Sequence, residues 1–336
     1  MSETFTIRKG DDFHCHFRTG NILKSVAKHT AAQFKRAVAM PNTIPPVLTA
    51  QNAADYRNEI RWACPELEAL MTVQINSGTT PEMIEEGYNS VVVAGKVYPQ
   101  GVTTNSENGV SDFKAIYPAL EKMQELGMPL LLHGEDPWEK VVCFSREKMF
   151  LPTFYGIACD FPRLKIVLEH ISTEDAAGFI ARMPGNVAAT ITVHHLMLTI
   201  DDVVGGLIQP HNFCKPIVKM PQDREALLKA ATSGNPKFFF GSDSAPHRKE
   251  KKECSHGCAG VFSAPVAMPL LVQLFEERDA LNKLEDFVSK FGADFYGLPQ
   301  NNETITLSRQ DWEVREAHNG IVPFMEGETM HWKVHD

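Results

Sequence analysis

The chain has 336 residues, of which 43% are hydrophobic and 22% charged, and this composition excludes a disordered protein. Its 33 basic and 42 acidic residues give a formal net charge of −9, which argues against electrostatic binding to nucleic acid or to an anionic membrane. The length suits two ordinary domains or one large architecture such as an α/β barrel.

The N-terminal residues do not show the basic and then apolar pattern of a signal peptide. No apolar run approaches the roughly 18 residues that a membrane-spanning helix needs. The seven cysteines are odd in number and scattered, which favours free thiols in a reducing compartment. We therefore expect a cytoplasmic protein that acts on a small molecule, without nucleic acid or membrane as a partner.

Short apolar or β-branched runs recur along the chain, each followed by a turn and a helical stretch. We predict eight strands, in chain order Phe5–His16, Arg36–Met40, Ala69–Ile75, Ser90–Tyr98, Pro129–His133, Lys165–His170, Val187–Val193 and Lys237–Gly241. Helical patterns fall between and after them, at Ala50–Cys64, Pro81–Tyr88, Ser111–Leu126, Thr173–Arg182, Gln222–Thr232, Pro265–Arg278 and Leu281–Phe291. Predicted helix N-caps are Thr49, Thr80 before Pro81, and Ser172 or Thr173.

The strands are apolar almost throughout rather than alternating, which is typical of parallel strands buried on both faces. An open doubly wound sheet and a closed barrel both fit this pattern. Polar residues stand at the C-terminal ends of six strands, and only a closed barrel brings all six ends together. We predict an α/β fold, a (β/α)8 TIM barrel over residues 1–336 as one domain, with a C-terminal extension of about residues 292–336 packed on the barrel.

The first strand ends in His14-Cys15-His16. Residues two apart in a strand point to the same side, so both imidazoles face the barrel axis while Cys15 faces outward. Two imidazoles on one face favour zinc, although two polar loop residues remain an alternative. Asp11 and Asp12 are interpreted either as hydrogen-bond partners behind the imidazoles or as solvated turn residues.

Lys96 lies inside the apolar run Val91-Val-Val-Ala-Gly-Lys96. A lysine in a buried strand is costly unless it is neutral or paired. One interpretation is a lysine that reaches the barrel rim with its ammonium group in water. The other is a neutral amine that adds CO₂, because the resulting carbamate can bridge two metal ions.

His133 and His170 each close an apolar strand, and Asp243 follows the eighth strand. Together with His14, His16 and Lys96, these side chains suit two metal ions that activate a water molecule. The ring of strand ends therefore predicts metal-assisted hydrolysis. Dinucleotide, nucleoside triphosphate and serine-hydrolase motifs do not occur in the chain.

Three further side chains are expected at the same mouth of the barrel. Arg18, Asn42 and His247 could recognise a substrate carboxylate, with Arg18 able to bind it through two hydrogen bonds. Each could equally be an ordinary polar loop residue. Cys254 and Cys258 lack a second matching pair, so we do not expect a structural zinc ion there.

Taken in order, the motifs resemble the short bacterial (class II) dihydroorotases of the amidohydrolase superfamily. The segments that carry the resemblance are Phe13-His-Cys-His-Phe-Arg18, Met40-Pro-Asn42, Gly95-Lys-Val-Tyr-Pro99, Thr103-Thr-Asn-Ser106, Leu132-His-Gly-Glu135, Leu168-Glu-His170, Gly241-Ser-Asp-Ser-Ala-Pro-His247, Gly257-Cys-Ala-Gly260, Phe295-Tyr-Gly-Leu-Pro299 and Gly327-Glu-Thr329. The resemblance runs from about residue 11 to the end. It implies a homodimeric enzyme that reversibly hydrolyses dihydroorotate to N-carbamoyl-aspartate in pyrimidine biosynthesis.

The resemblance also implies roles for individual residues. The metal set would be two Zn²⁺ ions, held by His14, His16 and Asp243 on one side and by His133 and His170 on the other, with a hydroxide and N6-carboxylated Lys96 as bridges. Asp243 would in addition be the catalytic proton shuttle. The substrate set would be Arg18, Asn42, His133, Lys215, His247 and Ala259, under a mobile loop that carries Thr103 and Thr104.

Lys215 departs from the family pattern, which has an apolar residue there that touches the substrate through its backbone. A backbone contact tolerates this change. The alternative enzyme is another cyclic-amide hydrolase of the hydantoinase or allantoinase type, which shares the metals but not the carboxylate clamp. A mononuclear deaminase would not need Lys96. A non-catalytic partner of another pyrimidine-pathway enzyme would be expected to lack ligands that this chain retains.

Overall fold

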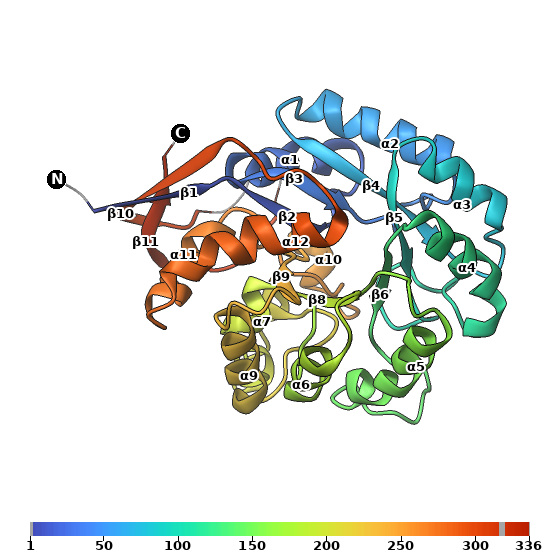
Figure 1. The fold of residues 1–336 in the computed structure, drawn as a ribbon. Coiled ribbons are helices and arrows are strands. Elements are labelled where there is room, and N and C mark those ends of the chain that lie inside the picture. Colours follow the sequence, from blue (N-terminus) through green and yellow to red (C-terminus); the bar gives the residue numbers. More distant parts are fainter. Residues whose placement is uncertain (1–2, 316–319, 336) are drawn as a thin grey trace.

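The computed structural model describes residues 3–315 and 320–335, and its centre is a barrel of eight parallel strands surrounded by helices (Figure 1). The strands pair in sequence order, each with the next. They are β2 (Gly10–Cys15), β3 (Phe34–Ala39), β4 (Glu68–Ile75), β5 (Val92–Val97), β6 (Leu130–His133), β7 (Ile166–Glu169), β8 (Val187–Ile191) and β9 (Phe238–Phe240). The predicted (β/α)8 barrel is thus confirmed.

The helices of the described chain lie mostly on the outside of the barrel (Figure 1). They are α1 (Gly20–Gln33), α2 (Ala50–Ala63), α3 (Pro81–Tyr88), α4 (Tyr117–Leu126), α5 (Arg146–Asp160), α6 (Glu174–Arg182), α7 (Val193–Met197), α8 (Asp201–Val204), α9 (Pro221–Ala231), α10 (Lys249–Lys252), α11 (Ala267–Glu276) and α12 (Phe291–Tyr296), with shorter helical turns η1 (Phe113–Ile116), η2 (Pro210–Asn212), η3 (Leu281–Lys283) and η4 (Asp286–Lys290). No helix among the described residues is both long enough and apolar enough to cross a bilayer.

Side-chain caps start several helices as predicted. The hydroxyls of Thr49, Thr80 and Thr173 accept hydrogen bonds from backbone N–H groups in the first turns of α2, α3 and α6. Helices α1 and α5 were not predicted. α5 contains Pro152, which is unfavourable inside a helix. α1 does have the spacing of an amphipathic helix, but the prediction overlooked it. Its buried residues include Leu23, Val26, Ala27, Thr30 and Ala31.

The predicted first strand, Phe5–His16, is wrong as one continuous element. It divides into β1 (Thr4–Arg8) and β2, and only β2 belongs to the barrel. In β1, Phe5 and Ile7 alternate with polar residues, which suits a sheet with one wet face. β1 pairs with β10 (Thr304–Glu313), which pairs with β11 (Thr329–Val334), so both ends of the chain meet in a three-stranded antiparallel sheet beside the barrel (Figure 1).

The barrel interior is apolar and closed at the end where the strands begin. Its buried side chains are Phe13, Val38, Met40, Leu70, Ala94, Leu131, Val167, Ala188 and Phe239. α12 covers this end, because Tyr296 packs 4.9 Å from the Phe13 ring and Phe295 packs 5.7 Å from the Phe239 ring. The polar end of the barrel is therefore the end where the strands finish.

The seam between β2 and the residues after β9 closes the barrel. The N–H of Asp243 donates to the carbonyl of His14 at 2.8 Å, and the N–H of His16 donates to the carbonyl of Ser244 at 3.0 Å. Asp12 reinforces the seam, because its carboxylate accepts hydrogen bonds from the N–H and the hydroxyl of Ser242 at 2.8 and 2.5 Å. Residues more than 220 positions apart in the sequence are thus brought into contact.

Candidate active site

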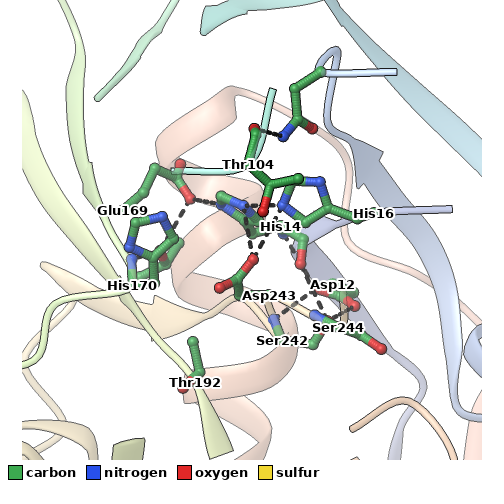
Figure 2. A network of polar contacts seen from close by, with 12 residues as sticks. Asp12, His14, His16, Thr104, Glu169, His170, Thr192, Ser242, Asp243 and Ser244 are labelled. Carbon is green, nitrogen blue, oxygen red and sulfur yellow. Dashed lines mark hydrogen bonds and ion pairs between the residues drawn. The ribbon is translucent and has the colours of Figure 1, made fainter. Parts of the chain in front are cut away.

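Three potential metal ligands converge at this seam (Figure 2). His14 Nε2 lies 3.3 Å from His16 Nε2 and 3.4 Å from Asp243 Oδ1, and His16 Nε2 lies 3.1 Å from the same oxygen. Ligand atoms about 2.0–2.1 Å from a tetrahedral zinc ion are roughly 3.3 Å apart. The spacing of these three buried atoms therefore fits one Zn²⁺ ion.

The local backbone explains why His14 points inward. The register of β2 is irregular between Asp12 and Cys15, which lets Phe13 and His14 both face the barrel interior. Asp12 also accepts a hydrogen bond from the N–H of His14 at 3.1 Å. Asp12 is buried, as is Asp11, so the interpretation of these two residues as solvated turn residues is wrong.

Glu169 orients the His14 ring from behind. The Glu169 carboxylate contacts His14 Nδ1 (Figure 2). It also accepts a hydrogen bond from the Thr190 hydroxyl at 3.1 Å. Burial lowers the pKa of His14, but the Glu169 charge and the hydrogen bonds with Asp243 and Glu169 together raise it above its ordinary value. Because the carboxylate occupies Nδ1, Nε2 is the nitrogen that faces His16 and Asp243.

The imidazoles form a continuous row across the barrel mouth. Ring centroids are 5.2 Å apart for His16 and His14, 4.9 Å for His14 and His170, and 4.7 Å for His170 and His133. His133 Nε2 lies 2.8 Å from the buried carboxylate of Glu135. Nδ1 is therefore the nitrogen of that ring that could bind a metal ion. The row thus continues past the His14, His16 and Asp243 cluster to two further imidazoles.

Lys96 lies beneath this row, on the interior face of β5 that Ala94 shares. It is fully buried, so the interpretation as a lysine that reaches water at the rim is wrong. Nζ has no hydrogen-bond partner among the described residues. Burial lowers the pKa of Lys96 to about 8, against the opposing effect of the Glu169 and Asp243 charges. A substantial fraction of the amine is therefore neutral near physiological pH.

The predicted substrate residues surround a cavity of about 20 Å³ above the imidazoles. The side chains and backbone that line it include Arg18, Asn42, Thr103, Thr104, His133, Lys215 and Ala259. His247 is the exception, because it lines a neighbouring cavity instead and reaches the site through Arg18. Its Nε2 lies 3.0 Å from Arg18 Nη2.

The segment that carries Thr103 and Thr104 lies over the cavity. Asn42 Nδ2 donates to the carbonyl of Thr104 at 3.1 Å, and Asn105 Nδ2 donates to the carbonyl of Asn42 at 2.9 Å. The Ser106 hydroxyl accepts from the N–H of Thr103 at 3.0 Å, which keeps the turn compact. These bonds hold the segment in a closed position.

Lys252 connects the two backbone segments that line the far side of the cavity. Its buried ammonium donates to the carbonyls of Phe213 and Cys258 at 3.2 and 3.3 Å, and also to the carbonyl of Gly260. Burial lowers its pKa to about 8. The first of these carbonyls lies two residues before Lys215, and the other two flank Ala259. Lys252 therefore holds both segments in register.

Glu169, Glu135 and Lys252 are functional candidates that sequence reasoning missed. Glu169 ends the apolar strand Ile166-Val-Leu-Glu169, and the argument used for Lys96 applies equally to a carboxylate in that position. Glu135 stands two residues after His133, a spacing that allows contact. Lys252 gave no signal, because it sits in the charged run Lys249-Glu-Lys-Lys252 that is typical of a solvated surface.

No protein-family model matches the chain. The chain is 47% identical to the dihydroorotase of Teredinibacter turnerae, over 99% of each protein. It matches the structure of the dihydroorotase from Saccharomyces cerevisiae in complex with 5-fluoroorotic acid at a TM-score of 0.94 and 37% identity, over 99% of this chain and 98% of that one. An L-hydantoinase from Arthrobacter aurescens gives a TM-score of 0.84 at 13% identity, over 98% of this chain and 83% of that one, a likeness of fold alone.

Proposed function

The chain belongs to the dihydroorotase family of cyclic amide hydrolases, and we propose that it opens dihydroorotate to N-carbamoyl-aspartate, reversibly, in pyrimidine biosynthesis. Full-length similarity to dihydroorotases favours this activity over the hydantoinase alternative. One observation supports the substrate most directly. The Arg18 guanidinium and the Asn42 amide line the same small cavity as the His14, His16 and Asp243 cluster, so a carboxylate group and a metal site are within reach of one small molecule.

We propose that two Zn²⁺ ions are the cofactors. His14, His16 and Asp243 would hold one ion, His133 and His170 the other, and N6-carboxylated Lys96 would join them. The 3.1–3.4 Å ligand spacing supports this assignment, as does the Lys96 Nζ, which has no hydrogen-bond partner in the described part of the chain. Bound there, the ions would supply an activated hydroxide and polarise the ring carbonyl.

The side chains would transfer the proton and bind the substrate carboxylate. Asp243 would accept the proton of the nucleophile that adds to the ring carbonyl carbon, and would return that proton to the departing ring nitrogen as the C–N bond breaks. Burial raises the pKa of Asp243, but hydrogen bonds with His14 and His16 and the charges of the neighbouring imidazoles together hold it well below its ordinary value. Arg18, Asn42 and His247 would together bind the substrate carboxylate, Arg18 and Asn42 from the cavity itself and His247 through its contact with Arg18.

Substrate entry requires the segment with Thr103 and Thr104 to move. A cavity of about 20 Å³ accommodates a water molecule but not a six-membered ring. Breaking the two Asn42 hydrogen bonds to this segment would open the site, and their return would exclude water from the reacting groups.

We also propose that residues 1–336 work as one domain with about residues 292–336 as its extension, that the protein is a homodimer, and that it resides in the cytoplasm. The pairing of β1 with β10 supports the first point, because it ties the extension to the start of the chain. The other two points rest on the family resemblance and, for the cytoplasm, on the seven free cysteines.

The decisive experiment is ring opening of dihydroorotate by the purified protein, followed by absorbance with and without a chelator. Activity that the chelator abolishes and Zn²⁺ restores is expected. Arg18→Met should cost several kcal/mol of transition-state binding for dihydroorotate and little for a neutral cyclic amide. Faster turnover of hydantoin than of dihydroorotate, unaffected by Arg18→Met, would instead establish the hydantoinase alternative.

A further inference from the structure

A second group of metal-binding side chains lies outside the proposed active site. His194 and His195, both in α7, and Cys214 place one ligand atom each within 4.8 Å of one another. They are 0%, 2% and 1% exposed. The reaction proposed above uses none of the three, so their clustering needs its own explanation.

His194 is the strongest sign of a missing ligand. Its Nδ1 and Nε2 are both buried and lack a hydrogen-bond partner among residues 3–315 and 320–335. Leaving one buried polar atom unpaired costs about 1–3 kcal/mol. A neutral imidazole has one N–H that needs an acceptor and one lone-pair nitrogen that needs a donor or a cation. A cation held by the lone-pair nitrogen satisfies that second need.

His195 is oriented toward Cys214. The Thr192 hydroxyl lies 2.8 Å from His195 Nδ1 and accepts the His195 N–H at 3.0 Å, which fixes the ring. Nε2 then points at Cys214 Sγ, 3.8 Å away, and at the carbonyl oxygen of Pro216, 3.0 Å away. That oxygen also lies 3.2 Å from Cys214 Sγ. A sulfur, a nitrogen and an oxygen thus face one point that His194 also approaches.

We propose that His194, His195 and Cys214 form a further metal site for a thiophilic d¹⁰ cation, Zn²⁺, separate from the catalytic cluster, with the Pro216 carbonyl as an additional oxygen ligand. Two imidazoles and one thiolate are a ligand set that Zn²⁺ prefers. The ion is structural, because it joins α7 to the segment that contains Lys215.

Binding at this site displaces protons. Burial raises the pKa of Cys214 to about 12, so the thiol is protonated in the absence of an ion. The cation forms its bond to sulfur as the thiol proton leaves to solvent, and a bond to His195 Nε2 requires that the proton of that ring reside on Nδ1, facing Thr192. No oxidant or reductant is needed.

Cobalt substitution tests this site independently of activity. The full-length protein is stripped of metal and loaded with Co²⁺, whose bond to a thiolate gives a charge-transfer absorption band in the near ultraviolet. The proposed catalytic ligands include no thiolate, so the band reports only a cysteine site. We expect the band in the wild type, its loss in Cys214→Ser, and its retention in Cys258→Ser, which removes a cysteine outside the cluster.

The zinc content of a second variant provides an independent test, which does not require that Cys214→Ser folds. His194→Gln should hold about one Zn²⁺ fewer per chain than the wild type by mass spectrometry of the native protein, with unchanged circular dichroism. A cobalt-loaded wild type without the thiolate band, or a band that persists in Cys214→Ser, overturns the proposal. An equal zinc count in His194→Gln and the wild type also overturns it.

Discussion

The protonation state of Lys96 leads to a quantitative prediction about how the proposed carbamate forms. Only the neutral amine reacts with CO₂, and burial lowers the pKa of this lysine from 10.5 to about 8. At pH 7 that change raises the neutral fraction from roughly 0.03% to about 9%, a gain of about 300-fold. Below about pH 8 the neutral fraction rises about tenfold for each pH unit, and above it the fraction levels off.

The assay is the recovery of activity by metal-free protein. Stripped enzyme receives Zn²⁺ at a fixed concentration of dissolved CO₂, and the rate at which dihydroorotate hydrolysis returns is measured across a series of pH values. We expect this rate to rise about tenfold per pH unit and to bend to a plateau near pH 8. Glu169→Gln should move the bend to lower pH, because it removes a negative charge that favours the ammonium form of Lys96.

Two results would refute this reasoning. A reactivation rate independent of dissolved CO₂ would show that no carbamate forms. A rate that keeps rising without a bend to about pH 10 would show that Lys96 titrates as an ordinary solvated lysine, contrary to its complete burial.

Three further predictions follow from the site and the core. Asp243→Ala should lower kcat by about 10²–10⁴ while the protein keeps part of its metal, as measured by steady-state kinetics and metal analysis of the same sample. Lys252→Met should raise KM about tenfold or more with a smaller change in kcat, because three backbone carbonyls beside the substrate lose their charged donor. Arg36→Met should lower the free energy of unfolding by about 3–5 kcal/mol in urea titrations, because it leaves the buried carboxylate of Asp11 without its cation.

Matched substitutions control these experiments. Lys251→Met changes the exposed neighbour of Lys252 and should leave KM unchanged. Arg278→Met breaks the half-exposed pair with Glu225 and should cost less than about 1 kcal/mol. Near-normal turnover by Asp243→Ala would remove it as the proton shuttle. Equal effects of Lys252→Met and Lys251→Met, or of Arg36→Met and Arg278→Met, would contradict the roles argued from burial.

The sequence predicts the barrel well, because an apolar run with one polar residue at its end indicates where a strand lies. It also indicates which side chains of that strand point into the barrel. Lys96 and His133 illustrate this, since each lies two residues after an interior apolar residue of its own strand. His14 does not follow the rule, because an irregular register in β2 turns it inward beside Phe13. That irregularity depends on the seam with Ser242, more than 220 residues away, which no local pattern encodes.

Other features depend on contacts that arise only on folding. Glu169 contacts His14 across the barrel. Its own motif suggests a role only for the next residue, His170, so Glu169 was not predicted. Lys252 is buried although its run of charges is typical of a solvated helix. The separation of β1 from β2 follows from β10, a partner near the other end of the chain.

The sheet that joins the two ends of the chain has a consequence for biosynthesis. Thr4 pairs with Ser308, so at a translation rate of about 5–20 residues per second β1 waits roughly 15–60 s before its partner strand is made. During that interval β1 lacks its partner strand and presents an open edge, the kind of surface that recruits other strands into aggregates. A chain truncated before Thr304 would keep this edge unpaired.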